Sequence, residues 1–582
     1  MSWINRIPAV HQARTYQREW LAKDVVAGVV LVGLLAPAGM AYASAAGLPP
    51  VNGLYASIIP LFVYALIGPS RVLVIGPDSA LTPLIIAAVV PLAATGSAQA
   101  VAVAGTLAII AGLLCVVAGL GRFGFIAELL SAPVRYGYLH GIALTILVAQ
   151  AAKLCGFSVG GETILGQLRQ FADGLGDDRL RVWALVVGVA AVVTILTLRS
   201  ISRAIPATLI VVVTSVIVSL AADLEGRGVP IVGDIARGIP RPALPDIGWS
   251  TAKSLVGASV GIAFVAFADT SVMSRVMADR RREHADSNNE LIALGVANIA
   301  SGMFHGFPVS ASSSRTPVAD ALGSRTQLTG AISAVLMLVI ALAAPATFRH
   351  VPEAALAAIV VAAAVTLIDI PAMVRLWQVR RSEFLLAVVA TLGVAVLGPV
   401  SGVVVAVTLS VLNFLRKAWK PYTAELVRVR GLKGYHDRGR HPEGSVIPGL
   451  ALYRFDAPLF FANARFFAED VERVIEARDN IRCLIITAEP ITDIDVTAAD
   501  TVHDLRLRLE ARGVELRFAE LKGVVRDRLQ RYGVFDHHPA ALQARTVGEA
   551  VKQYLRDFDV HWVDWEDQSS NGADTEPPGD GG

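Results

Sequence analysis

Long apolar runs separated by short polar islands fill the chain from about residue 25 to residue 415. A helix that crosses the hydrocarbon core of a bilayer needs about 20 apolar residues, at about 1.5 Å per residue. On that rule the sequence predicts about fourteen membrane spans, of which the third and the tenth are short or interrupted. They are residues 25–44, 51–68, 73–93, 98–118, 134–154, 182–198, 205–222, 252–274, 287–304, 312–322, 327–347, 353–369, 383–397 and 400–416.

The pattern changes after residue 418, where charged residues become frequent. Short β-branched runs over 450–455, 482–487 and 514–519 predict strands. Between them, amphipathic stretches over 466–477 and 498–512 predict helices. We therefore expect a small α/β domain over 448–560, after a linker at 419–447, and a disordered tail of Gly, Pro, Ser and acidic residues at 561–582.

Composition agrees with a membrane protein, because 54% of the residues are hydrophobic, 17% are charged and the mean hydropathy is +0.56. The net charge of +2 is spread over loops, and no nucleic-acid motif is present. The three cysteines have no metal-ligand spacing. We also find no hydrolase elbow, nucleotide loop or zinc signature. The sequence thus predicts neither an enzyme, nor a cofactor, nor a bound metal, nor a nucleic-acid partner.

Arginine and lysine positions predict the orientation of the spans. Basic residues such as Arg71, Arg122 and Arg199 follow the even-numbered spans, and loops on the cytoplasmic side carry such residues. Residues 1–24 are polar and Arg-rich, with no signal-peptide pattern. We therefore expect both termini, including a cytoplasmic segment at 1–24, on the inner side of the plasma membrane.

Two segments in the membrane region break the rules for a lipid-facing helix. Residues 72–81 run through Gly76-Pro77 into a helix that is predicted to begin at Asp78 or Ser79, both good N-caps. Residues 305–316 are extended through Pro308 and then enter a short helix opened by hydroxyls. Irregular backbone at membrane depth persists only where protein or a water-filled cavity satisfies its polar groups. One such half-helix in each half of the chain predicts a transport site between them.

The cargo that these half-helices favour is an anion, because a helix N-terminus presents unpaired N–H groups and a partial positive charge. Arg315, in the second half-helix, adds positive potential. N-capping explains Asp78 equally well, and a flexible loop is the alternative for the serine run. The predicted substrate-binding residues are Asp78, Ser79, Ala80, Ser310, Ala311, Ser312, Ser313, Ser314 and Arg315.

Asp269 is an acid inside the predicted span 252–274. Such an acid costs about 2.5–3.5 kcal/mol on insertion scales, so it normally faces a cavity or a partner. A carboxylate near an anion site repels the anion unless it is protonated, which would couple proton and anion movement. The alternative is a structural ion pair with Arg315 or Arg275.

At these residues the chain resembles the SulP family of anion transporters, relatives of the mammalian anion exchangers that include prestin. The resemblance covers nearly the whole chain and rests on several motifs taken together. They are Met40-Ala-Tyr-Ala, Ala46-Gly-Leu-Pro-Pro-Val-Asn-Gly-Leu-Tyr-Ala-Ser, Ile75-Gly-Pro-Asp-Ser-Ala, Gly302 through Ser310, Ser314-Arg-Thr, Thr326-Gln-Leu and Pro352 through Ile359.

The resemblance implies fourteen spans as two inverted seven-span repeats, arranged as a mobile core domain and a gate domain. It also implies a cytoplasmic STAS domain with a possible cytoplasmic partner, and a homodimer. The family's anion pocket maps to Asp78–Ala80 and Ser310–Ser314, and its eighth-span acid to Asp269. Thr497 occupies a position that is phosphorylated in some soluble STAS proteins; the alternative is an ordinary helix-start residue.

Two departures from the family pattern concern the substrate and the coupling ion. Ala38 stands where members often have a glutamine near the anion, which removes one hydrogen bond. Met273 stands where sodium-coupled bicarbonate members have a threonine, and a thioether is a poor sodium ligand.

From these residues we expect a secondary active transporter of a small inorganic oxyanion, sulfate first, by proton symport through Asp269 and an elevator-type movement of the core domain. Transport of bicarbonate or a dicarboxylate, coupled to sodium or protons, is the alternative within this class. A membrane-anchored STAS signalling scaffold that does not transport is the alternative outside it.

Overall fold

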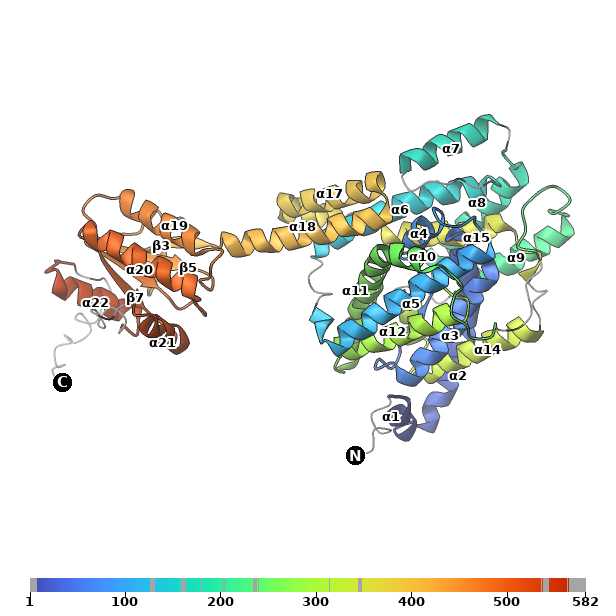
Figure 1. The fold of residues 1–582 in the computed structure, drawn as a ribbon, viewed down its shortest axis with the longest axis horizontal. Coiled ribbons are helices and arrows are strands. Elements are labelled where there is room, and N and C mark those ends of the chain that lie inside the picture. Colours follow the sequence, from blue (N-terminus) through green and yellow to red (C-terminus); the bar gives the residue numbers. More distant parts are fainter. Residues whose placement is uncertain are drawn as a thin grey trace, which may run out of the picture. The chain divides into compact units, whose positions relative to one another are not determined.

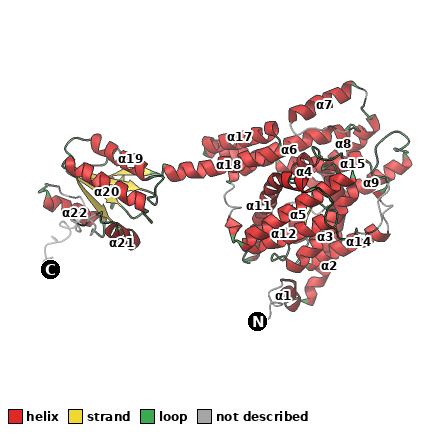
Figure 2. Ribbon diagram, viewed as in Figure 1, coloured by secondary structure: helices red, strands yellow, loops and turns green. Residues whose placement is uncertain are grey.

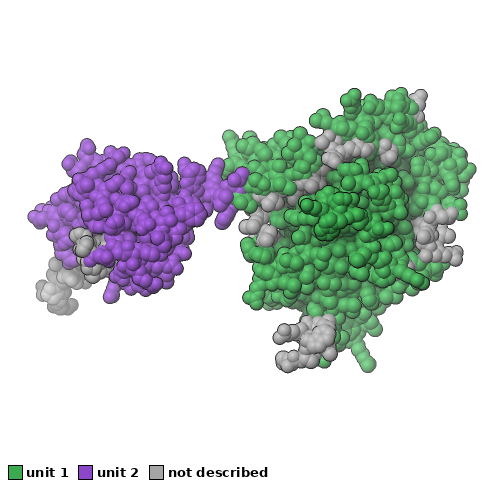
Figure 3. Space-filling model, viewed as in Figure 1, with its two compact units in different colours: residues 1–411 green, residues 412–582 purple. Residues whose placement is uncertain are grey.

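The computed structural model describes residues 8–125, 131–157, 159, 164–177, 179–202, 205–233, 238, 240–312, 315–343, 348–534, 536, 544–562 and 564. The chain forms two compact units, residues 1–411 and 412–582 (Figure 3).

The first unit consists almost entirely of helices (Figures 1 and 2). The helices are α1 (Pro8–Arg14), the 3-10 turn η2 (Arg18–Trp20), α2 (Leu21–Ala45), α3 (Pro50–Ile67), α4 (Thr82–Val89), α5 (Ala98–Leu120), α6 (Ala132–Leu154), α7 (Ile164–Gly176), α8 (Val182–Ile201), α9 (Ala207–Ala221), α10 (Trp249–Ser254), α11 (Val256–Arg281), α12 (Ser287–Met303), α13 (Arg315–Ala321), α14 (Leu328–Ala343), α15 (Glu353–Leu367), α16 (Ile370–Val379), α17 (Arg381–Leu397) and α18 (Pro399–Trp419), the last of which continues into the second unit. Two short strands, β1 (Ile75–Gly76) and β2 (Ser310–Ala311), complete it.

Each predicted span overlaps a helix; the third, 73–93, also includes β1, and the tenth, 312–322, overlaps α13 and begins directly after β2. In the described part of the chain, seven helical segments are long and apolar enough to cross a membrane by length and composition. They are Arg18–Ala45, Pro50–Ile67, Ala98–Leu120, Ala132–Leu154, Val182–Ile201, Val256–Arg281 and Glu353–Val379. Helices α1, α7 and α16 lie outside the predicted spans, and α10 begins before the span 252–274, because a rule that looks for long apolar runs does not detect short or amphipathic helices.

Glycines let α5 and α12 approach until their backbones touch. A Cβ added to Gly112 of α5 would lie 2.5 Å from the carbonyl oxygen of Gly295 in α12. One at Gly302 of α12 would lie 2.3 Å from the carbonyl oxygen of Gly105 in α5. Small residues at such contacts drive helix association in membranes, where burial from water contributes little.

The helices pack in two groups. Contacts link α2, α3, α5, α11, α12 and α14 into one group and α6, α8, α15 and α17 into the other, and the two groups meet where α2 contacts α15. Gly137 of α6 lies so close to α17 that an added Cβ would be 2.0 Å from the carbonyl oxygen of Ala387. We call the set that contains α2, α3, α5, α11, α12 and α14 the core group. We call the set that contains α6, α8, α15 and α17 the gate group.

The second unit is a five-stranded sheet with the strand order β4-β3-β5-β6-β7. The strands are β3 (Thr423–Arg428), β4 (Tyr435–Asp437), β5 (Leu450–Phe455), β6 (Cys483–Thr487) and β7 (Glu515–Ala519). The helices are α19 (Ala464–Glu476), α20 (Val496–Ala511), α21 (Gly523–Arg531) and α22 (Val547–Asp557). Strands β5, β6 and β7 are parallel, whereas β3 runs antiparallel to both β4 and β5.

Residues 419–447, which the sequence predicts to be a linker, include β3 and β4. Ala424 and Leu426 of β3 are buried against Leu452 of β5, so this segment is part of the domain. Sequence analysis missed β3 because its polar and apolar residues alternate briefly among charges. Of the predicted tail, only residues 561, 562 and 564 lie in the described part of the chain.

Candidate functional site

Two extended segments from opposite halves of the first unit meet as an antiparallel pair. Ile75 of β1 is opposite Ala311 of β2, and Gly76 is opposite Ser310. The pairing continues where the Ser312 amide donates to the Val74 carbonyl oxygen at 3.0 Å. The two interruptions that the sequence predicts therefore lie side by side.

Each strand leads through a short connection into a short helix, and a side chain accepts a hydrogen bond from a backbone amide next to each connection. On the first side the Asp78 carboxylate accepts a hydrogen bond from the Ala80 amide at 3.0 Å, and α4 begins at Thr82. On the second side the Ser312 hydroxyl oxygen accepts from the Arg315 amide at 3.2 Å. The first helix begins later than the predicted Asp78 or Ser79, because residues 79–81 form a turn that Asp78 closes.

The structure brings most of the predicted substrate residues together around this strand pair. Ser79, Ala80, Ser310, Ala311, Ser312 and Arg315 are buried, and Asp78 is partly exposed. Ser313 and Ser314 lie outside the described residues.

Arg315 ties the two segments together through its side chain. Its guanidinium donates to the Pro77 carbonyl oxygen, which lies just before the turn into α4. Its Nε and the hydroxyl oxygen of Ser310 are buried, with no hydrogen-bond partner among the described residues. Because a buried donor without a partner is costly, both groups are suited to a ligand that accepts hydrogen bonds.

Threonine hydroxyls hold the strand pair from both sides. The Thr316 hydroxyl oxygen accepts from the Val74 amide at 3.1 Å. The Thr270 hydroxyl oxygen accepts from the Ala311 amide at 3.2 Å and donates to the Ala266 carbonyl oxygen at 2.6 Å. Thr270 follows Asp269 in α11, so the position of β2 depends directly on that helix.

Asp269 is partly exposed in α11 and has no hydrogen bond or ion pair with any residue that the structure describes. The two arginines proposed as its structural partners bind elsewhere: Arg315 donates to Pro77, and Arg275 donates to the Ser271 hydroxyl at 2.9 Å. The charges of Asp78 and of Arg135 in α6 act on its carboxyl group. Asp269 thus lies near Asp78, one of the predicted substrate residues, and near α6 of the gate group.

Sequence analysis missed Glu290, a fully buried acid of α12. Its carboxylate accepts from the hydroxyls of Tyr64 at 2.6 Å, Ser70 at 2.5 Å and Ser274 at 2.7 Å. Glu290 lies inside the predicted span 287–304, so the reasoning applied to Asp269 would have found it. The three hydroxyls belong to α3, to the segment before β1 and to α11. Glu290 therefore connects these three parts of the core group to α12.

Tyr42 and Gln327 are two further polar residues that the sequence did not single out. Tyr42 of α2 is buried, and its hydroxyl interacts electrostatically with Asp78 and Arg315. The Gln327 amide donates to the carbonyl oxygens of Ser70 at 2.8 Å and Leu73 at 2.9 Å, and so fixes the chain that leads into β1.

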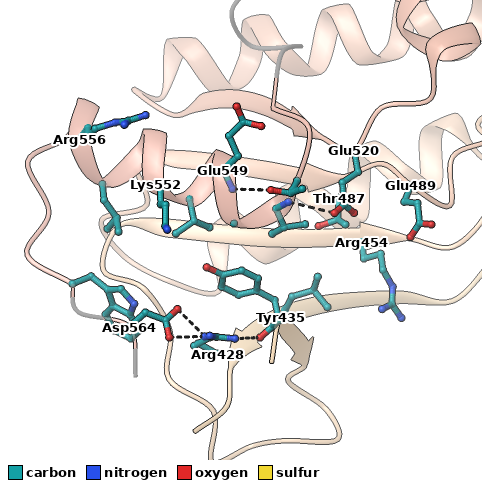
Figure 4. Close-up of a pocket in the computed structure, with 18 residues that line it drawn as sticks. Arg428, Tyr435, Arg454, Thr487, Glu489, Glu520, Glu549, Lys552, Arg556 and Asp564 are labelled. Atoms are coloured by element: carbon teal, nitrogen blue, oxygen red, sulfur yellow. Dashed lines mark hydrogen bonds and ion pairs between the residues drawn. The ribbon is translucent and has the colours of Figure 1, made fainter. Parts of the chain in front are cut away.

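The second unit contains a cavity of about 850 Å³ on the α22 face of its sheet (Figure 4). Its cations and acids are mixed: Arg428 pairs with Asp564 at 2.8 Å, and the Glu520 carboxylate accepts from the Val547 amide at 3.4 Å. The buried hydroxyl of Thr487 has no partner among the described residues. Because the charges are of both signs, this cavity lacks the uniform positive field of an anion site.

Thr497 lies on another part of the second unit, in the first turn of α20. Asp495 caps this helix by accepting from the Ala498 amide at 2.8 Å, and the Thr497 side chain is exposed. Among the described residues, no group of three or more His, Cys, Asp or Glu is arranged to hold a metal ion.

Comparison with known proteins assigns both units. Residues 21–390 match the sulfate permease family, and residues 441–550 match the STAS domain. The chain is 40% identical over 550 residues to a protein of Mycobacterium tuberculosis (strain ATCC 25618 / H37Rv) named "Probable sulfate transporter". That match covers 94% of this chain and 98% of the relative.

Two solved structures share the fold. The structure of SLC26A9 superposes with a TM-score of 0.86 at 22% identity, covering 96% of this chain and 93% of that one. The transmembrane domain of the cyanobacterial bicarbonate transporter BicA superposes with a TM-score of 0.59 at 25% identity, covering 68% of this chain and 98% of that one.

Proposed function

Since the chain belongs to the sulfate permease family, whose members are membrane anion transporters and not enzymes, we propose that it moves sulfate across the plasma membrane together with protons. The observation that carries the proposal is the antiparallel pair of strand–helix segments joined by Arg315, with buried hydrogen-bond donors that no described protein group satisfies.

An oxyanion is the ligand that this geometry favours. The Arg315 guanidinium supplies a permanent charge, and the Ser310 hydroxyl supplies a buried donor. The turn 79–81 and Ser312 lie near the starts of two short helices, and the partial positive charge of a helix start favours an anion. The anion would bind among Asp78, Ser79, Ala80, Ser310, Ala311, Ser312 and Arg315, with Ser313 and Ser314 following in sequence.

Asp269 is the residue that we assign to proton coupling. When ionised, its carboxylate adds to the negative charge of Asp78 and opposes anion binding; when protonated, it removes one repelling charge. An acid without a fixed partner is free to exchange a proton. Protons are favoured over sodium because Met273, one turn further along α11, offers a sulfur atom and not an oxygen.

The movement that we propose is a displacement of the core group against the gate group. The strand pair belongs to the core group, through Thr270 of α11 and the Gln327 contacts, so it would move as one body. Facing Asp269 across the boundary are Arg135 and Tyr138 of α6, and the buried Tyr138 hydroxyl has no described partner. Cytoplasmic termini, a homodimer and a cytoplasmic partner for the STAS domain remain part of the proposal.

Uptake into proteoliposomes tests the function. Radiolabelled sulfate and bicarbonate are supplied separately, with a proton gradient, with a sodium gradient and with neither. We expect sulfate uptake that an inwardly directed proton gradient accelerates and a sodium gradient does not. If no anion enters under any gradient, the transporter proposal fails, and a membrane-anchored STAS scaffold takes its place.

Bicarbonate is the second candidate cargo, and the observation that favours it is the likeness to the BicA transmembrane domain. A dicarboxylate is the third. Ala38, buried in α2, leaves this side of the site without a side-chain amide, so the same assay decides among the anions.

A further inference from the structure

A second cavity of about 530 Å³ lies at the other end of α2 from the chain's N-terminus. Its walls come from Ser44 and Pro49 at the α2–α3 connection, Thr82 at the start of α4, Gly96, and Gln150 and Lys153 of α6. Because α2 crosses the membrane from the N-terminal side, this cavity opens on the opposite side, which is the outer side in the proposed orientation.

The cavity adjoins the strand pair through α4. Thr82, which lines it, is the first residue of α4 and donates its hydroxyl to the Asp78 carbonyl oxygen at 2.9 Å. Core and gate groups both contribute walls, since α2 belongs to the core group, α4 contacts α2 and α11 of that group, and α6 belongs to the gate group. An anion entering from the outer side would pass along these walls to reach Arg315.

Lys153 is a cation in this cavity without an ion pair among the described residues. Its ammonium donates to the Ser44 carbonyl oxygen at 2.5 Å and to the Ser44 hydroxyl at 3.3 Å. An ammonium has three donors, so one N–H has no partner in the described part of the chain. A neutral carbonyl and a hydroxyl leave its charge largely uncompensated.

Gln150 lies one turn before Lys153 on the same helix and also lines the cavity. As a whole residue Gln150 is only 3% exposed, yet its amide makes no hydrogen bond with any residue that the structure describes. Buried amides normally find partners, so this one is suited to a bound group. The Gln150 amide and the free N–H of Lys153 together form a pair of donors on one face of α6.

Glu353, at the start of α15, is the other charged residue among the described lining residues. Its charge acts on Lys153 without forming an ion pair in the described structure. An anion bound at Lys153 would therefore be attracted by the ammonium and repelled by this carboxylate. Because the attraction by Lys153 and the repulsion by Glu353 oppose each other, the affinity for an anion would be low, as a site that binds and then releases the anion requires.

We propose that Lys153 and Gln150 form a second, transient oxyanion site at the outer entrance, from which the anion passes to the strand pair. The site deepens the proposed function and rests on it and on the proposed orientation. Lys153 supplies the charge, Gln150 supplies a neutral donor, and Glu353 keeps the affinity low.

The test measures the initial rate of sulfate uptake against sulfate concentration in right-side-out and inside-out vesicles. Lys153→Met is expected to raise the outer KM by about fivefold or more, because a charge-assisted hydrogen bond is lost, and to leave the inner KM unchanged. Lys153→Arg keeps the charge and should restore an outer KM near that of the wild type.

Glu353→Gln is the matched opposite variant. It removes the repelling charge from the same cavity, so the outer KM should fall while that of Lys153→Met rises. A folding defect lowers the amount of active protein, and therefore the maximal rate, in both variants alike. Opposite shifts in KM cannot come from misfolding.

Three results would overturn the inference. The first is an outer KM that does not change in Lys153→Met. The second is an equal rise of the inner and the outer KM in that variant. The third is an increase of its maximal rate alone, which would mean that Lys153 restrains the movement of the helices and does not bind the anion. Transport by the wild type tests the proposed function separately. If the wild type carries bicarbonate in place of sulfate, the same variants are measured with bicarbonate.

Discussion

At the scale of single residues, the site depends on a few side chains that bind backbone groups. Arg315 donates to the Pro77 carbonyl oxygen, and Thr270 accepts from the Ala311 amide at 3.2 Å. Each contact joins two segments that are far apart in sequence. Asp269 differs from them, because no described residue holds its carboxyl group.

Asp269→Asn is expected to remove the acceleration of sulfate uptake by a proton gradient. The amide has the shape of the protonated carboxyl but cannot release a proton, so anion binding should become independent of pH. Uptake rates at several external pH values check this. Asp279→Asn, an exposed position on the same helix, is the control and should keep the wild-type pH dependence. Full proton dependence in Asp269→Asn would contradict the assignment.

Thr270→Val is expected to weaken sulfate binding and to lower the stability of the protein. The valine leaves the buried Ala311 amide without its acceptor, which costs about 1–3 kcal/mol. Thr270→Ser keeps the hydroxyl and should retain both properties. The apparent KM for sulfate and the thermal midpoint in detergent measure the two effects. Equal behaviour of the valine and serine variants would show that the hydroxyl does not position β2.

At the scale of elements, irregular backbone in the membrane region is stable because the two irregular segments pair with each other. Strands β1 and β2 satisfy part of their backbone in this pairing, and hydroxyls satisfy more of it. Polar backbone in lipid requires such internal partners. Close helix contacts such as that of α5 with α12 provide the rigid frame that holds the pair.

Gly112→Leu should disrupt that frame. A side chain at Gly112 meets the carbonyl oxygen of Gly295 at 2.5 Å, so the two helices must separate. Overpacking of this kind costs about 1–3 kcal/mol or more, and we expect a thermal midpoint several degrees lower. Gly257→Ala in α11 is the control, because nothing lies within 4 Å of its added Cβ. A Gly112→Leu protein as stable as the control would exclude a close contact.

At the scale of the whole molecule, the chain consists of two units with separate cores. The second unit buries apolar residues on both faces of its sheet, one face against α19, α20 and α21 and the other against α22. A sheet that is covered by helices on both sides forms a complete hydrophobic core, as an independent domain does. Its folding should therefore not require the membrane unit.

Residues 412–582, produced alone, are expected to fold and to protect Cys483, the single cysteine of this unit. Burial raises the pKa of Cys483 to about 12. A raised pKa lowers the thiolate fraction at pH 8 by about three orders of magnitude, so a thiol reagent should react slowly. The rate with and without urea measures this protection. Rapid reaction without urea would mean that the unit does not fold alone.

The sequence by itself determined the class of the molecule. Runs of about 20 apolar residues match the thickness of the bilayer's hydrocarbon core, and their spacing placed the helices nearly where the structure has them. The same local reading located both half-helix segments, because Gly76-Pro77 and Pro308 interrupt apolar runs. It also marked Asp269, since an acid within a span stands out against its neighbours.

Only the tertiary structure decided how these parts combine. The pairing of Ile75 with Ala311 and the contact of Arg315 with Pro77 join residues more than two hundred positions apart, and no local pattern encodes such a partner. The same holds for three polar residues of the helices, Glu290, Gln150 and Lys153. Their hydrogen bonds, and the donors that have no partner among the described residues, are defined only once the helices pack. Hydrophobic periodicity is a local property of the sequence, whereas a binding site consists of polar groups that are far apart in sequence and close together in the folded protein.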